Sequence, residues 1–161
     1  MTALTLLWRQ KRMGGKRKIR LIVDFEGYNC SKFIIKEIAF INTKTNSCRN
    51  YFLKTYKLNN STYFWLLKYY HHIPYWYGEC RFSKVKNILN NKQFEFLVKD
   101  NIKYEILKKL TNNRVTVLNN CPSFFNLTKS NNFCDFHRSD CNKHCAVNKV
   151  SRIAYWYGSS K

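Results

Sequence analysis

The sequence predicts an α/β domain with a mixed β-sheet flanked by helices, and three observations support this fold class. The chain has 161 residues, the size of a single domain that can bury a core. Apolar residues make up 45% of the chain, which excludes disorder throughout. Three strand-like segments come first, and helical and strand-like segments then alternate, an order typical of a mixed sheet covered by helices.

The first three strands are expected to form a meander between residues 18 and 56. The apolar run in "KIRLIVDFEG" predicts a buried strand of about seven residues that ends at its acidic residues. "FIIKEIAFI" and "CRNYFLKTY" are rich in β-branched and aromatic residues and flank the turn-like "NTKTNS". These three segments would therefore pair in sequence order.

The remaining elements alternate between helix and strand. "STYFWLLKYYHHI" and "SKVKNILNN" each begin with a serine suited to cap a helix. "QFEFLVK" and "RVTVL" predict strands on either side of the amphipathic helix "DNIKYEILKKL". The polar loop "NNCPSFFNLTKSNN" precedes a last helix in "CAVNKVSRIAYWYG". We expect residues 1–17 to form a basic N-terminal arm and residues 18–161 to form the domain.

The charge of the chain points to a polyanionic partner. Lysine and arginine number 29 against nine acidic residues, a formal net charge of +20. Such a field attracts nucleic acid through phosphate contacts and counterion release, without distinguishing DNA from RNA. The alternative is that abundant lysine and asparagine reflect AT-rich codon usage. In the aromatic stretch around residue 76, residues 75–77 ("YWY") are the candidates for stacking on bases. Nothing in the pattern indicates the oligomeric state.

The cysteines and the N-terminus favour an intracellular setting, nuclear or cytoplasmic. Seven cysteines are an odd number, which would leave one thiol over from a full set of disulfides. The apolar start "MTALTLLW" precedes its basic run, the reverse of a secretory signal. No apolar stretch approaches the length of a membrane span, so no membrane contact is expected. In a reducing compartment, clustered cysteine and histidine favour metal binding over disulfides.

Asp24 and Glu26 form a D-x-E pair in the first predicted strand. Because side chains alternate along a strand, both carboxylates lie on the same side. Two neighbouring negative charges are costly unless a cation neutralises them, and oxygen ligands suit Mg²⁺ or Mn²⁺. The alternative is a strand end in solvent, where such pairs are common.

Three short motifs resemble those of the DEDD 3′–5′ exonucleases, in particular the DEDDh branch. "LIVDFEG" is similar to the first motif, and Asn101-x-x-Tyr104-Glu105 is similar to the second. "HCAVNK", which starts at His144, is similar to the third motif, His-x-Ala-x-x-Asp. The resemblance covers residues 18–157 and implies a ribonuclease-H-like fold, with a three-stranded meander first.

The resemblance also implies a two-metal nuclease centre. Asp24, Glu26 and Glu105 would hold two Mg²⁺ or Mn²⁺ ions, and His144 would be the general base. Two departures weaken this expectation. Glu105 replaces the shorter aspartate, and Lys149 stands at the position of the fourth acid.

An ammonium group at the fourth position would repel metal ions. The neighbouring Asn148 is neutral, and only Asp135 or Asp140 in the preceding loop could substitute. We therefore expect weak or absent nuclease activity together with a retained nucleic-acid-binding groove.

A zinc site is predicted near the last helix. Cys134-x₂-His137 has the spacing of a zinc half-site. Two ligand sets are open: Cys134, His137, Cys141 and His144, or Cys121, Cys134, His137 and Cys145. The second set closes the long polar loop onto the last helix and leaves His144 free to act as a base.

Three functions therefore stay open. The first is a divergent DEDDh-like nucleic-acid-binding protein with little or no nuclease activity. The second is a zinc-stabilised nucleic-acid-binding module without catalysis. The third is a protein-interaction descendant of the same fold, whose charge is a by-product of codon usage.

Overall fold

The computed structural model describes residues 17–29, 32–55, 61–138 and 144–160. Its five strands form one mixed sheet in the order β3-β2-β1-β4-β5. The strands are β1 (Ile19–Asn29), β2 (Phe33–Asn42), β3 (Cys48–Phe52), β4 (Phe94–Val98) and β5 (Val115–Val117). β2 is antiparallel to both β1 and β3, whereas β4 is parallel to β1 and β5 is parallel to β4. The predicted α/β class and the initial meander are confirmed. The predicted arm, apart from residue 17, lies outside the described residues.

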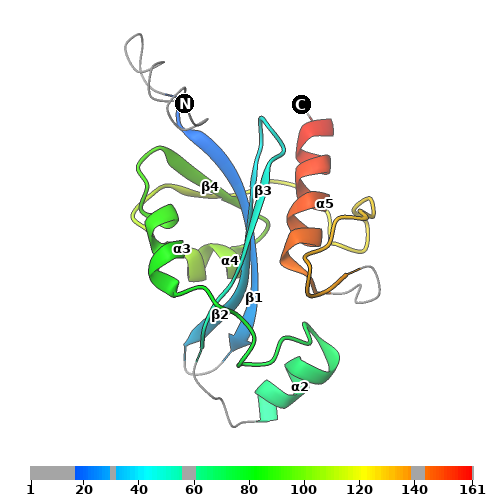
Figure 1. Ribbon diagram of the computed structural model, residues 1–161. Coiled ribbons are helices and arrows are strands. Elements are labelled where there is room, and N and C mark those ends of the chain that lie inside the picture. The colour runs from blue at the N-terminus through cyan, green and yellow to red at the C-terminus, as the bar shows by residue number, and fades with distance from the viewer. Residues whose placement is uncertain (1–16, 30–31, 56–60, 139–143, 161) are drawn as a thin grey trace.

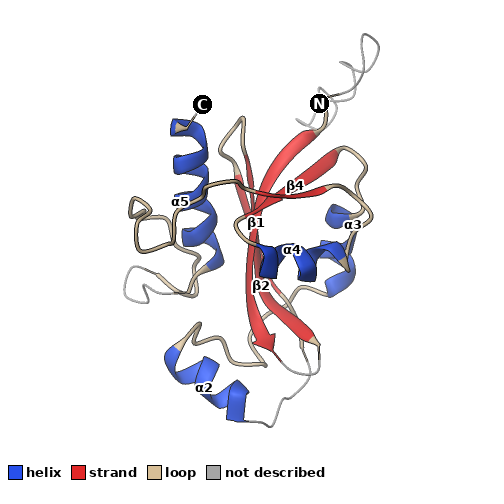
Figure 2. Ribbon diagram, turned by 180° about the vertical axis from the view of Figure 1, so that it is seen from behind, coloured by secondary structure: helices blue, strands red, loops and turns tan. Residues whose placement is uncertain are grey.

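Helices flank the sheet on both faces. They are α2 (Ser61–Tyr69), α3 (Phe82–Leu89), α4 (Asn101–Lys108) and α5 (Ala146–Ser159). α3 and α4 lie on one face of the sheet and α5 lies on the other, while α2 lies near the carboxyl end of β1 (Figures 1 and 2). Within the described ranges, no helix has the length and apolar character needed to cross a membrane.

The strict alternation of β1 produces two separate cores. Leu21, Val23 and Phe25 pack on one face, in the cluster that includes the α3 and α4 side chains. Ile22 packs on the opposite face, in the cluster that includes Val150 of α5. Because side chains two residues apart share a face, the carboxylates of the D-x-E pair follow Ile22 toward α5.

β1 does not end at its acidic residues, so that part of the prediction is wrong. Beyond Ile22 the strand loses its β4 neighbour but keeps pairing with β2 as far as Asn29.

A β-bulge falls between Glu26 and Gly27. A Cβ atom at residue 27 would lie 2.0 Å from the carbonyl oxygen of Ile34, so only glycine fits there.

The helix predicted for residues 61–73 ends earlier, at Tyr69. The following segment turns into the core, where His71 and Ile73 are fully buried. His71 Nε2 donates to the carbonyl oxygen of Gly27 (3.1 Å), and its Nδ1 accepts from the amide of Ile73 (3.0 Å). Burial lowers the pKa of His71 to about 4, so the ring is neutral.

The long polar loop before α5 is held against that helix. Leu127 and Cys134 from the loop are buried in the α5-side core. Arg152 of α5 donates to the carbonyl oxygens of Phe124 and Leu127. The loop therefore forms part of the layer that covers this face of the sheet.

Candidate functional site

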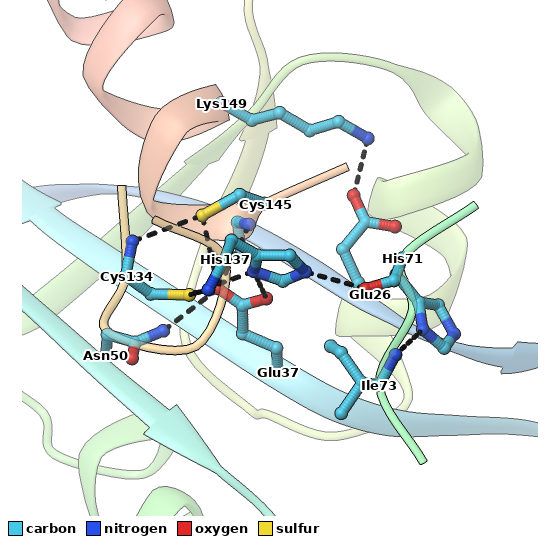
Figure 3. Close-up of polar contacts among 10 residues, drawn as sticks. Glu26, Glu37, Asn50, His71, Ile73, Cys134, His137, Cys145 and Lys149 are labelled. Atoms are coloured by element: carbon cyan, nitrogen blue, oxygen red, sulfur yellow. Dashed lines mark hydrogen bonds and ion pairs between the residues drawn. The ribbon is translucent and has the colours of Figure 1, made fainter. Parts of the chain in front are cut away.

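The D-x-E pair lies buried between β1 and α5, and each carboxylate has its own lysine. Asp24 and Glu26 are 1% and 3% exposed. Lys103 of α4 places its Nζ 3.2 Å from Asp24 Oδ1. Lys149 of α5, itself buried, donates from Nζ to Glu26 Oε1 at 2.5 Å (Figure 3). Lys103 reaches β1 because the strand extends past the end of β4.

The charge on Lys149 is stabilised by its surroundings. Burial by itself would lower the pKa of Lys149, but the charges of Glu26 and Asp24 outweigh it and raise the pKa above its usual range. At 2.5 Å and an effective dielectric constant of about 20, the attraction between Lys149 and Glu26 is about 7 kcal/mol before desolvation is counted. The ammonium group is therefore a fixed part of this centre.

The other predicted members of the nuclease centre do not complete it. Glu105 is exposed on α4, and among the described residues it forms no group with Asp24 and Glu26 whose ligand atoms lie within 4.8 Å. His144 stacks on Tyr70, with ring centroids 3.3 Å apart. Lys149 occupies the same neighbourhood, with its Nζ 5.5 Å from the Tyr70 ring.

Of the two loop acids, Asp135 does not fill the fourth position. Asp135 is exposed, and Asp140 lies outside the described residues. Asn148, beside Lys149, donates from its amide to the carbonyl oxygens of Ser130 and Asn132. Its side chain therefore serves to hold the loop.

The donor set does not fit the two divalent ions that the exonuclease resemblance implies. Asp24 Oδ2 is buried without a hydrogen-bond partner among the described residues, so one oxygen is available. The ammonium groups of Lys103 and Lys149, however, already neutralise the two carboxylates. A divalent ion would have to displace at least one of them or lie against it, which like-charge repulsion opposes.

A second group lies on the same face of the sheet and consists of Glu37, Cys134, His137 and Cys145. All four side chains are buried, and their ligand atoms lie within 4.8 Å of one another. His137 Nδ1 is 2.9 Å from Cys134 Sγ and 3.4 Å from Glu37 Oε2. Cys145 Sγ is 3.7 Å from Glu37 Oε1 (Figure 3). This group could hold a metal ion.

Local structure brings the two halves of the group together. Residues 134–138 form a turn in which the Arg138 amide donates to the carbonyl oxygen of Cys134 (3.1 Å) and the His137 amide donates to Cys134 Sγ (3.3 Å). Cys145 is the N-cap residue of α5. Glu37 comes from the middle of β2, on the face that carries Ala39 and Ile41.

Further hydrogen bonds orient the ligand atoms. His137 Nε2 donates to the carbonyl oxygen of His71 at 2.7 Å, which leaves a lone pair on Nδ1 for the cluster. Glu37 Oε1 accepts from Asn50 Nδ2 and from the amide of Ala146, both at 3.1 Å. Glu37 Oε2 is buried and accepts no hydrogen bond from the described residues.

The electrostatics of the cluster oppose an anionic Glu37 that has no cation beside it. Burial raises the pKa of Glu37 well above its usual range, and the charges of Cys145 and Glu26 act in the same direction. The hydrogen bond from Cys134 lowers the pKa of Cys145. A divalent ion among these groups would stabilise the anionic forms that burial opposes.

The structure therefore brings together three members of the second predicted zinc set and replaces the fourth. Cys121 is half-buried and lies outside the group, and Glu37 takes its place. In the other predicted set, His144 also lies outside the group, and Cys141 is not among the described residues. One signal for Glu37 was present in the sequence: "FIIKEIAFI" puts an acid inside an apolar strand, where a buried charge needs a partner.

No protein-family model matches the chain, and no curated protein matches it.

Proposed function

We propose that the protein is a nucleic-acid-binding protein with a ribonuclease-H-like fold, related to the DEDDh exonucleases and lacking two-metal nuclease activity. The sheet order β3-β2-β1-β4-β5, with β2 antiparallel to its neighbours, supports the fold. The positions of the helices after β3, β4 and β5 support it as well.

The observation that carries the loss of nuclease activity is the contact between Lys149 and Glu26. A nuclease of this type needs carboxylates that are free to bind divalent ions. Here the ammonium groups of Lys149 and Lys103 provide the positive charge instead. Because Lys149 is buried and hydrogen-bonded to Glu26, removing it from the centre would cost several kcal/mol.

The distribution of charge supports nucleic-acid binding. Among the described residues, the acids Asp24, Glu26 and Glu37 are buried together with Lys36 and Lys149, so the excess of basic groups remains at the surface. Trp76 is 69% exposed beside a pocket of about 470 Å³ that Tyr51 and Tyr77 also line. An exposed aromatic ring on a chain of net charge +20 offers a base a place to stack, and the charged residue in the lining of this pocket is Glu79.

A binding and cleavage experiment tests this proposal. The purified protein is titrated into labelled single-stranded DNA and RNA of equal length, at salt concentrations from about 50 to about 200 mM. We expect an affinity that falls linearly on a log–log plot and a 3′ end that stays intact with Mn²⁺. Processive 3′ trimming that Asp24→Ala abolishes would refute the loss of activity. No binding at physiological salt would favour the protein-interaction alternative.

The protein would also hold one structural metal ion, and zinc is the ion that best suits the Glu37, Cys134, His137 and Cys145 group. Thiolates combined with imidazole favour zinc over magnesium, calcium or manganese. The four side chains are buried, as in a closed structural site, whereas a catalytic zinc keeps a position open to substrate.

A further inference from the structure

We propose, on the basis of the zinc ion included in the proposed function, that Glu37 is its fourth ligand. The site would then be a Cys₂HisGlu clamp that fastens the loop before α5 to the middle of β2. The two cysteines and the histidine come from residues 134–145, a short part of the chain. Glu37 lies about a hundred residues earlier and is the ligand that would anchor this segment to the sheet.

The distances approach those of tetrahedral coordination, although the two that fit reach different oxygens of Glu37 and the third is too short. Ligands about 2.0–2.3 Å from zinc lie roughly 3.3–3.8 Å from one another in a tetrahedron. Glu37 Oε2 is 3.4 Å from His137 Nδ1, and Glu37 Oε1 is 3.7 Å from Cys145 Sγ. The sulfur of Cys134 lies 2.9 Å from His137 Nδ1 and would move outward by less than 1 Å.

The register of the sheet places Glu37 where its anionic form needs a cation nearby. Glu26 and Glu37 lie directly opposite each other on β1 and β2, and like charges at such positions are destabilising. Glu26 has Lys149 as its counter-charge. Glu37 Oε2, by contrast, is fully buried and accepts no hydrogen bond from the described residues. A zinc ion would supply the missing positive charge.

The surroundings also suit the excess negative charge of such a site. Two thiolates and one carboxylate exceed the zinc charge by one. Cys145 caps α5, so its sulfur lies at the positive end of the helix dipole. Amide groups of Cys134 and His137 donate to the two sulfurs, at 3.4 and 3.3 Å. The His71 carbonyl fixes the tautomer of His137 and extends the clamp to the segment after α2.

Metal analysis and cobalt substitution test the ligand set. The full chain is purified without chelator and its zinc content is measured. The protein is then stripped and titrated with Co²⁺, which reports thiolate ligands through charge-transfer bands and tetrahedral geometry through intense d–d bands. We expect about one zinc per chain, a tetrahedral thiolate spectrum, and an unfolding temperature about 10 °C lower after stripping.

Four variants identify the ligands. Glu37→Gln keeps a hydrogen-bond acceptor at Oε1 but removes the anionic ligand, and Cys134→Ser removes one thiolate. Both should lower zinc affinity by more than about 100-fold, beyond the roughly 10–100-fold loss typical of an outer-shell partner. Cys121→Ser should retain zinc and leave the cobalt spectrum unchanged. Asn50→Ala removes only a hydrogen bond to Glu37 and should cost less than Glu37→Gln.

Three outcomes would overturn the clamp. One is less than a tenth of an equivalent of zinc together with no cobalt binding by the wild-type chain, a result that does not depend on any variant folding. Another is loss of zinc in Cys121→Ser. The third is unchanged zinc affinity in Glu37→Gln. Nucleic-acid binding is read separately on the same samples, so failure of the clamp and failure of the binding function are distinguishable.

Discussion

Replacing Lys149 by methionine should destabilise the protein by about 4 kcal/mol at pH 7, because Glu26 would lose its counter-charge while buried. Removing one partner of a buried ion pair costs about 3–5 kcal/mol. Protonation of Glu26 limits this loss of stability, because a neutral carboxyl group needs no counter-charge. Neutralising a carboxyl group of ordinary pKa about 4.3 costs about 3.7 kcal/mol at pH 7 but only about 1 kcal/mol at pH 5.

The sign of the pH dependence follows from the same linkage. In the wild type, burial already raises the pKa of Glu26, and the charge of Lys149 opposes that rise. In the variant this opposition is lost and the folded pKa of Glu26 rises further above its unfolded value, so the folded state binds more protons and loses stability as the pH rises. The cost of Lys149→Met, measured against wild type by urea unfolding, should therefore fall from about 4 kcal/mol at pH 7 to about 1 kcal/mol at pH 5.

A double variant is the matched control. Glu26→Gln combined with Lys149→Met removes both charges and should recover most of the stability at pH 7, since neutral partners need no counter-charge. A loss below about 1 kcal/mol at pH 7 in the single variant would refute the reasoning. An equal loss at pH 5 and pH 7, or no recovery in the double variant, would refute it as well.

Three other predictions concern the core and the surface. The free energy of unfolding should fall by up to about 3 kcal/mol as the pH falls from 6.5 toward 4, because the unfolded chain binds a proton at His71 and the folded chain does not. Urea unfolding should therefore show a flatter pH profile for His71→Gln than for wild type. Gly27→Ala should destabilise the protein by about 3 kcal/mol, since its Cβ would collide with the β2 backbone. As a control, the Cβ of Gly158→Ala in α5 meets no atom within 4 Å, and thermal melts should show this variant to be as stable as wild type or slightly more stable. Trp76→Ala should weaken single-strand binding by about 1–3 kcal/mol without changing the unfolding temperature, and Phe125→Ala, which removes a ring that is 96% exposed, should leave binding unchanged in a fluorescence titration.

Each of these has a result that contradicts it. Parallel pH profiles for wild type and His71→Gln would show that another group titrates. A Gly27→Ala variant as stable as wild type would mean that the bulge can shift. Equal losses of binding in Trp76→Ala and Phe125→Ala would indicate a general effect of surface aromatic residues.

Local pattern was sufficient for the order and type of the elements. Strands and helices follow from apolar periodicity and from cap and turn residues, which act over a few positions. The same alternation predicted that Asp24 and Glu26 share one face of β1, and they do. One of the two predicted zinc sets contained Cys134, His137 and Cys145, and the ligand atoms of these three residues do lie in one group.

Local pattern failed where burial depends on distant neighbours. Ile102 continues the apolar face of the amphipathic helix α4 yet is 73% exposed. The extent of β1 was missed because pairing with β2 continues after β4 has ended. Periodicity predicts which residues share a face of a helix or strand, but the neighbouring elements decide how much of that face is buried.

The sequence by itself determined which chemical groups the protein has: a D-x-E pair, a lysine in place of an acid, and a cysteine–histidine cluster. Only the tertiary structure decided which of them meet. It paired Glu26 with Lys149 across 123 residues and added Glu37 to the cluster in place of Cys121. The physical reason is that the neutralisation of a buried charge depends on distances in space, and the sheet register and the docking of α5 fix those distances.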